Sequence, residues 1–137
     1  MRKYIDKDYI YNRDGGACVL CGRQLRRNNF SVDHYFPKSA GGTYDVFNLV
    51  SACKKCNQRK KSMIPVDYEA VAIKLFKEAV KDKKVMLTNN KIYCHSKLLE
   101  LIEHVQGVTT DNGVVIFNSA ELIFYVRQNK IVLVRPL

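Results

Sequence analysis

Four of the five cysteines fall into two identical C-x-x-C pairs, and this repeated spacing is the clearest chemical signal in the chain. The first pair is Cys18 and Cys21, and the second is Cys53 and Cys56. Each pair can present two thiolates on one side of a tight turn, and four thiolates complete the tetrahedral coordination that suits structural zinc. Such a closed site leaves no position for a substrate. We therefore predict a zinc site that holds the fold together.

Other interpretations of the cysteines are an iron–sulfur cluster, a redox pair or unrelated buried residues, and the doubled spacing favours zinc over each of them. A zinc tetrathiolate carries net negative charge, so some nearby cations are expected to offset it instead of contacting a ligand. These cations are Arg23, Arg26, Arg27, Lys54 and Lys55. The fifth cysteine, Cys94, is distant in sequence from both pairs and is expected to be an ordinary buried residue.

Polar residues of a second kind lie between and just after the cysteine pairs. An apolar stretch ends at Asp33 and His34, Asn48 lies before the second pair, and Asn57 follows it directly. A neutral imidazole at His34 can take a proton from water, because histidine titrates near neutrality. Magnesium prefers oxygen ligands, which Asp33 and Asn57 supply. Each residue alone is more often structural, but together, in this order, they favour metal-assisted cleavage of a phosphodiester.

The span from residue 13 to residue 64 resembles the HNH endonuclease family. The family's landmarks occur in order: R-D-G-x-x-C-x-x-C-G, a strand ending in D-H, P-x-S-x-G-G, N-L, and C-x-x-C-N followed by basic residues. The resemblance implies that His34 is the general base and that Asn48 fixes the loop bearing it. It assigns Asp33 and Asn57 as ligands of a catalytic ion. The third motif residue is asparagine instead of histidine, which favours magnesium or manganese.

The resemblance also implies a fold, a ββα-metal module stapled by the zinc. Strands are expected over residues 30–34 and 48–52, and a helix over residues 54–61. A glycine-containing loop over residues 37–46 joins the two strands. Because the zinc ties strand and helix ends together, a very small core can hold an accurate site.

Pro65 marks the expected end of the module, since proline lacks the amide that a continuing helix requires. We expect two parts, a nuclease module over residues 1–65 and a C-terminal extension of unknown role over residues 66–137. Both parts mix helices and strands, so the predicted fold class is α+β. In the extension, apolar residues at helical spacing predict a helix that begins after Asp67 and continues to about Lys81.

The rest of the extension is predicted to contain short elements. The first two are a hairpin over residues 85–94 that turns at Asn89-Asn90, and a helix capped by Ser96 and ended by Gly107. Strands are expected over residues 114–117 and 131–134. Between them, an Asn118–Glu121 capping box marks a helix start before residues 122–127.

The net charge of +10 is unevenly distributed. Residues 1–65 carry 13 Lys and Arg against 5 Asp and Glu, and residues 66–137 carry 10 against 8. A strongly basic half is typical of a polyanion binder, so DNA is the expected partner, with RNA as an alternative. The expected phosphate contacts are a group flanking the site: Lys38, Arg59, Lys60 and Lys61.

The apolar fraction of 47% supports a folded core. No secretory signal follows Met1, and no apolar stretch is long enough to cross a membrane, so we expect a cytoplasmic protein without a membrane partner. Cleavage of both DNA strands by so small a protein would call for a homodimer, whereas nicking needs one site. By analogy with the family, a compact HNH protein of this kind resembles those of phages, mobile elements or restriction systems.

Two other functions stay open at this point. A zinc-containing nucleic-acid-binding protein that no longer cuts would explain the charge and the cysteines, but not the spacing of the other polar residues. A third possibility gives residues 66–137 the main task, as a target-selecting or protein-interaction domain. Neither the recognised bases nor the number of strands cut is specified by these patterns.

Overall fold

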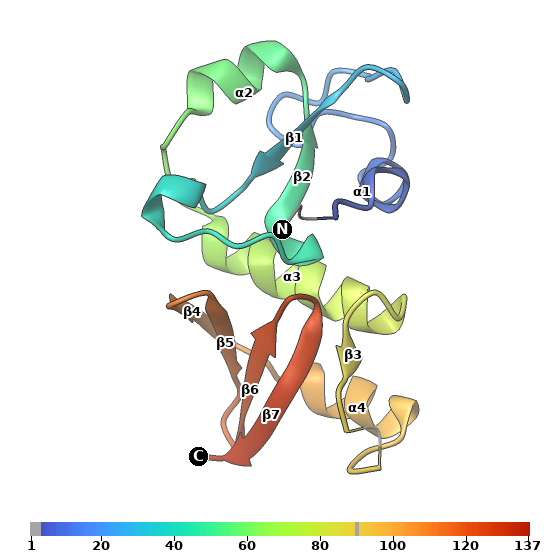
Figure 1. Ribbon diagram of the computed structural model, residues 1–137, viewed down its shortest axis with the longest axis vertical. Helices are drawn as coiled ribbons and strands as arrows, with labels where there is room; N and C mark the ends of the chain where they lie inside the picture. The colour runs from blue at the N-terminus through green and yellow to red at the C-terminus, as the bar shows by residue number, and fades with distance from the viewer. Residues whose placement is uncertain (1–3, 90) are drawn as a thin grey trace. The chain divides into compact units, whose positions relative to one another are not determined.

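The computed structural model describes residues 4–89 and 91–137, and it divides into two compact units, Met1–Pro65 and Val66–Leu137. Helices form 32% and strands 28% of the chain, which confirms the predicted α+β class. Figure 1 shows the elements of each unit. In the part of the chain that the structure describes, no helix combines the length and apolar character that a membrane span needs.

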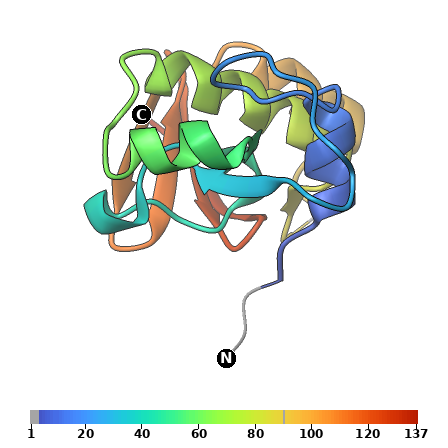
Figure 2. The same cartoon turned by 90° about the horizontal axis from the view of Figure 1, so that it is seen from above.

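The N-terminal unit is built on two short antiparallel strands and the helix that follows them. Its elements are α1 Lys7–Arg13, β1 Ser31–His34, the 3₁₀ turns Lys38–Ala40 and Val46–Asn48, β2 Leu49–Ala52 and α2 Lys54–Lys60. Strands β1 and β2 pair in a register that sets His34 opposite Leu49. Figure 2 shows α2, drawn in green, beside β1, drawn in light blue. The predicted strand–strand–helix order is confirmed, and each predicted element is one residue too long at one end.

Helix α1 lies in a segment for which no element is predicted. Asp6 is its N-cap, and its carboxylate accepts a hydrogen bond from the amide of Tyr9 at 3.2 Å. The helix packs against β2 and buries Ile10 completely. Tyrosines and charged residues surround that single buried position, so the segment has no apolar stripe from which a helix could be predicted.

A buried ion pair fastens the end of α1 to the chain around β2. The guanidinium of Arg13 contacts the carboxylate of Asp14 at 2.9 Å, and their side chains are only 3% and 5% exposed. Arg13 also donates to the carbonyls of Val46 and Leu49, at 2.9 and 2.6 Å. Asp14 accepts from the amide of Ser51 at 2.8 Å. The pair therefore fixes the backbone on both sides of residue 48.

The C-terminal unit packs two helices on one five-stranded sheet. Its elements are α3 Tyr68–Lys81, β3 Met86–Leu87, α4 His95–Ile102, β4 Gly107–Asp111, β5 Val114–Asn118, β6 Leu122–Arg127 and β7 Lys130–Pro136. The strand order is β3-β7-β6-β5-β4, an antiparallel meander to which β3 adds in parallel. The rings of Phe76 and Phe117 stack with centroids 3.9 Å apart at the centre of its core.

Two predicted elements of this unit are wrong. The predicted hairpin is a single short strand, β3, which pairs with β7, while Asn90 of its predicted turn lies outside the described residues. The predicted helix start before residue 122 is instead the turn between β5 and β6. Its Ser119 hydroxyl accepts hydrogen bonds from the amides of Glu121 and Leu122, at 3.3 and 3.0 Å. The alternating side chains of β6 bury part of the core. This burial outweighs the helix preference of the short capping pattern.

The segment around α4 also differs from its prediction. The helix begins at His95 with Cys94 at the N-cap position, so the predicted cap Ser96 lies inside it. Cys94 is exposed, which corrects the expectation that it is buried. Gly107 begins β4, where it pairs with Asn118, instead of ending the helix. A Cβ there would lie 2.5 Å from the side-chain oxygen of Asn118, so the position favours glycine.

We predict that Arg13→Met destabilises the N-terminal unit by about 3 kcal/mol, because removing one partner of a buried ion pair leaves the other charge uncompensated. Urea denaturation of the purified protein measures the loss. Arg26→Met is the matched control, since Arg26 is exposed and its removal is expected to change stability little. Equal stability of the two variants would contradict the role assigned to the pair.

Candidate active site

The four paired cysteines converge on one point. The sulfur atoms of Cys18, Cys21, Cys53 and Cys56 all lie within 4.8 Å of one another, and those of Cys21 and Cys53 are 3.9 Å apart. A tetrahedral zinc ion about 2.3 Å from each sulfur requires sulfurs about 3.8 Å apart. The cluster therefore fits the predicted structural zinc, and the pairing of the two C-x-x-C turns is confirmed.

Local backbone geometry prepares each turn for its ligands. Gly22 adopts a φ of 81°, a left-handed conformation that favours glycine, and its amide donates to the carbonyl of Cys18 at 2.8 Å. The amide of Cys56 points at the sulfur of Cys53 at 3.4 Å, and this contact lowers the pKa of the Cys53 thiol to about 7. The amide of Val19 donates to the carbonyl of Ser51, so the first turn is also joined to β2. A zinc ion bound by the four sulfurs would tie the first turn to the junction of β2 and α2.

Asp33 lies near the end of β1 and is 7% exposed. The ammonium of Lys60, from α2, is 3.2 Å from its Oδ2 atom and donates to the carbonyl of His34 at 2.9 Å. Burial raises the pKa of the Asp33 carboxyl, and the charge of Lys60 opposes that rise. The pair holds α2 against the end of β1.

His34 ends β1 beside an aromatic side chain. Its ring meets that of Tyr44 edge-on, with centroids 4.5 Å apart and an angle of 89° between the planes. Burial lowers the pKa of His34, and the positive charges of Lys38 and Lys60 lower it further. Its Nε2 atom is buried without a hydrogen-bond partner among residues 4–89 and 91–137. The imidazole is therefore neutral at neutral pH, with one nitrogen uncommitted.

Tyr44 is a residue of this site that sequence patterns did not indicate. The ammonium of Lys38 donates to its hydroxyl at 3.0 Å and lies 5.2 Å from its ring centroid. Tyr44 thereby joins Lys38 to the edge of the His34 ring. An aromatic residue shortly after Gly41 and Gly42 is the only signal in the sequence, and it resembles many loop tyrosines.

Asn48 joins the two ends of the loop between the strands. Its side-chain oxygen accepts from the amide of Phe36 at 2.8 Å, and its side-chain nitrogen donates to the carbonyls of Phe36 and Thr43, at 3.1 and 3.0 Å. The residue is 5% exposed. Within this loop, a Cβ on Gly42 would lie 1.8 Å from the carbonyl oxygen of Phe36, so only glycine fits. The loop after His34 is therefore held in one conformation.

Asn57 is half-buried on α2, three residues before Lys60. Residues at this spacing share one side of a helix, and Lys60 contacts the end of β1 from that side. The side-chain amide of Asn57 has no hydrogen-bond partner in the described residues, so its oxygen is available to a ligand. The proposed ion ligand thus lies on the side of α2 that faces β1.

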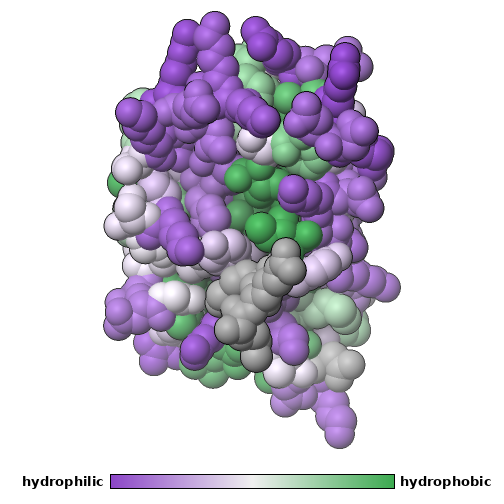
Figure 3. Space-filling model, turned by 45° about the horizontal axis from the view of Figure 1, so that its top comes forward, coloured by the Kyte–Doolittle hydropathy of each residue, from purple (hydrophilic) through white to green (hydrophobic). Residues whose placement is uncertain are grey.

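The expected phosphate contacts separate into two kinds. Lys38, Arg59 and Lys61 are exposed, as an electrostatic contact requires. Lys60 is 6% exposed and engaged with Asp33 and the backbone, so it differs from the surface cation that the sequence predicts. The pattern of consecutive basic residues could not show which of them turns inward. Hydrophilic side chains cover much of the face shown in Figure 3.

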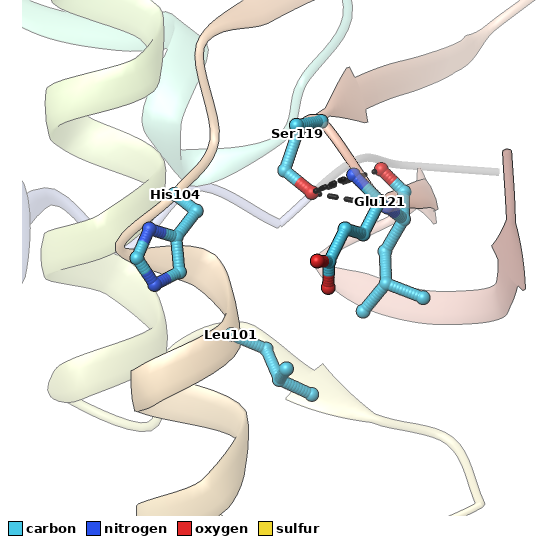
Figure 4. Close-up of a pocket in the computed structure, with 6 residues that line it drawn as sticks. Leu101, His104, Ser119 and Glu121 are labelled. Atoms are coloured by element: carbon cyan, nitrogen blue, oxygen red, sulfur yellow. Dashed lines mark hydrogen bonds between the residues drawn. The ribbon is translucent and has the colours of Figure 1, made fainter.

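A separate pocket of about 180 Å³ lies in the C-terminal unit, and its lining residues include His104, Ser119 and Glu121. Figure 4 shows the imidazole and the carboxylate at its edge. The Ser119 hydroxyl is used by the β5–β6 turn, and no ion pair or hydrogen bond joins His104 to Glu121 in the described part of the chain. The pocket therefore lacks an activated nucleophile, and the candidate catalytic residues lie in the N-terminal unit.

Comparison with known proteins agrees with this location. Residues 18–70 match the model of a family described as HNH endonuclease. No curated protein and no solved structure matches the chain. The matched residues contain both C-x-x-C turns, β1, β2 and α2, and the four clustered cysteines fit an HNH endonuclease module of the zinc-stapled type. The resemblance found in the sequence is confirmed, and this family acts on nucleic acids.

We predict that removing zinc unfolds the N-terminal unit, because the four thiols join the first cysteine turn to the β2–α2 junction around a small buried cluster. A strong chelator should lower the helix signal in circular dichroism, and stoichiometric zinc should restore it. Cys94→Ser is the matched control, since this exposed cysteine lies outside the cluster and its loss should leave the zinc content unchanged. A chelated protein that keeps its full thermal transition would contradict a structural role for the ion.

Proposed function

We propose that this chain is a metal-dependent endonuclease that hydrolyses phosphodiester bonds in DNA. The observation that supports it best is the meeting of β1 and α2 at Asp33 and Lys60, which brings the side of α2 that carries Asn57 towards the strand that carries His34. A buried carboxylate, an uncommitted amide and a neutral imidazole then belong to one small region. These are the groups that phosphodiester hydrolysis needs.

The residues fit a divalent ion of the hard, oxygen-seeking kind. Asp33 Oδ2 is buried and lacks a hydrogen bond of good geometry within the described chain, and its Lys60 contact is an ion pair alone. The amide oxygen of Asn57 is uncommitted. One carboxylate and one amide oxygen leave several positions for water and phosphate, as magnesium and manganese prefer. When bound, the ion supplies charge stabilisation at the phosphate and at the departing oxygen.

The chain's own residues divide the remaining tasks. The uncommitted Nε2 atom of His34 takes the proton of the attacking water, because its lowered pKa keeps the imidazole neutral. Asn48 positions this base by holding the loop that follows it. The exposed cations Lys38, Arg59 and Lys61 neutralise phosphates without reading bases.

A protein that binds nucleic acid without cutting it is the second candidate. The ion pair between Asp33 and Lys60 favours it, since the proposed ligand already has a cationic partner. Tight, salt-sensitive association with DNA, but no cleavage with magnesium, manganese or nickel, would establish this alternative. It would leave the neutral His34 with its uncommitted nitrogen unexplained.

Cleavage of supercoiled plasmid in the presence of magnesium tests the proposal. We expect nicked or linear product that EDTA abolishes, and His34→Ala should lower the rate at least about a hundredfold, as loss of a general base does. His104→Ala is the matched control, because it removes an exposed histidine of the C-terminal unit. Unchanged cleavage by His34→Ala, with zinc retained, would refute the assigned base.

The pH dependence of cleavage provides a second prediction. Because burial and two lysines lower the pKa of His34, activity should persist below pH 6.5 and fall only at more acidic pH. Lys38→Gln removes one of the charges that disfavour the imidazolium, so it should move the acidic limb of kcat/KM upward. A limb that shifts downward or does not move would contradict the electrostatic role of Lys38.

A further inference from the structure

We propose that Lys60 is a resident counter-ion of Asp33 that the divalent ion displaces when it binds. This inference rests on the proposed function and assigns Lys60 a positioning role in place of the phosphate contact that the sequence predicts. The contacts of its ammonium are the starting point. It lies 3.2 Å from the Asp33 carboxylate and donates to the His34 carbonyl at 2.9 Å.

Both partners of this pair are buried, as are those of the Arg13–Asp14 pair. The Lys60 and Asp33 side chains are 5% and 9% exposed, whereas the ion pairs of Arg27 with Asp8 and of Lys97 with Glu100 are formed by exposed side chains. Removing a lysine ammonium from water is unfavourable unless an anion compensates it. Each of the two charges therefore compensates the burial of the other.

Two cations cannot share the Asp33 oxygen at this geometry. Magnesium binds carboxylate oxygen at about 2.1 Å, so an ion on Oδ2 would lie within roughly 5 Å of an unmoved ammonium. Like charges at that separation repel strongly where water is scarce. The ammonium has a flexible four-carbon stem and can leave the carboxylate while α2 stays in place. Ion binding at Oδ2 thus requires Lys60 to release Asp33.

The consequence is an active site assembled before its ion arrives. Without the ion, the ammonium bridges Asp33 and the His34 backbone, so β1 and α2 keep their spacing. The same bridge weakens ion binding, because the ion must compete with a charge that is already present. Lys60 therefore lowers the affinity for the ion and, in return, keeps the ion-free site ordered.

Manganese binding, measured by electron paramagnetic resonance on zinc-loaded protein, tests the competition. Lys60→Met keeps the length of the side chain without its charge and should bind Mn²⁺ about tenfold more tightly than the unmodified protein, a factor equal to about 1.4 kcal/mol. Lys61→Met removes the same charge from an exposed neighbour and should change the affinity by less than about threefold, since exposed charges are screened. Asp33→Asn should abolish binding in either background.

A measurement on the unmodified protein covers the case in which Lys60→Met does not fold. Reductive methylation of lysines, followed by mass spectrometry, reports whether each ammonium is accessible. Lys60 should be protected without magnesium and should react at least about fivefold faster with saturating magnesium, whereas Lys61 should react equally in both conditions. In Asp33→Asn, the labelling of Lys60 should not depend on magnesium.

The outcomes separate this inference from the proposed function. Magnesium-dependent cleavage together with unchanged or weaker Mn²⁺ affinity in Lys60→Met would overturn the counter-ion role and leave the nuclease intact. Continued protection of Lys60 in magnesium-saturated, active protein would do the same. Absence of both cleavage and Mn²⁺ binding in the unmodified protein would instead refute the proposed function itself.

Discussion

The convergence of four sulfur atoms within 4.8 Å is the constraint on which the N-terminal unit depends. It joins the first cysteine turn to the junction between β2 and α2, where the second pair lies. The residues packed around it form a small buried cluster, Cys18, Leu25, Ala52 and Cys53. Other side chains of the unit, such as Ile10, Phe47 and Val50, are buried against β2 or within it. A four-residue cluster is too small to hold the first cysteine turn and α2 in place by hydrophobic burial alone. Zinc coordination would supply this restraint, and the ion pair of Arg13 with Asp14 fastens α1.

Charges around the end of β1 act in opposite directions on two neighbouring residues. Lys60 stabilises the Asp33 carboxylate against burial, while Lys60 and Lys38 both disfavour protonation of His34. Lysine charges therefore favour the charged form of Asp33 and the neutral form of His34, the pairing that the proposed hydrolysis requires. The net charge of +10 has this local role in addition to the attraction of a polyanion. Asn48 fixes the loop that follows His34, and Tyr44 of that loop contacts both the Lys38 ammonium and the His34 ring.

The C-terminal unit shows the limits of local patterns. Its first helix has a regular apolar stripe, and α3 follows the prediction closely. Where patterns are short, long-range pairing decides, as for β6, which lies between β5 and β7, and for β3, which pairs with a strand more than forty residues later in the chain. Strand β4 has polar residues at Thr109 and Thr110 and was not predicted, because its identity comes from its partner β5. Local propensity is a weak guide where a sheet neighbour supplies the hydrogen bonds.

The sequence by itself determined which four cysteines cluster, the order of the ββα module and the polar residues proposed for its site, because residue spacing and side-chain chemistry can be read without the fold. Only the tertiary structure decided which way each side chain faces. It turned Lys60 inward to Asp33 while leaving Lys61 exposed, and it brought Tyr44 to His34. Neighbours in a basic run look alike in sequence, whereas burial and the nearest opposite charge differ for each in space.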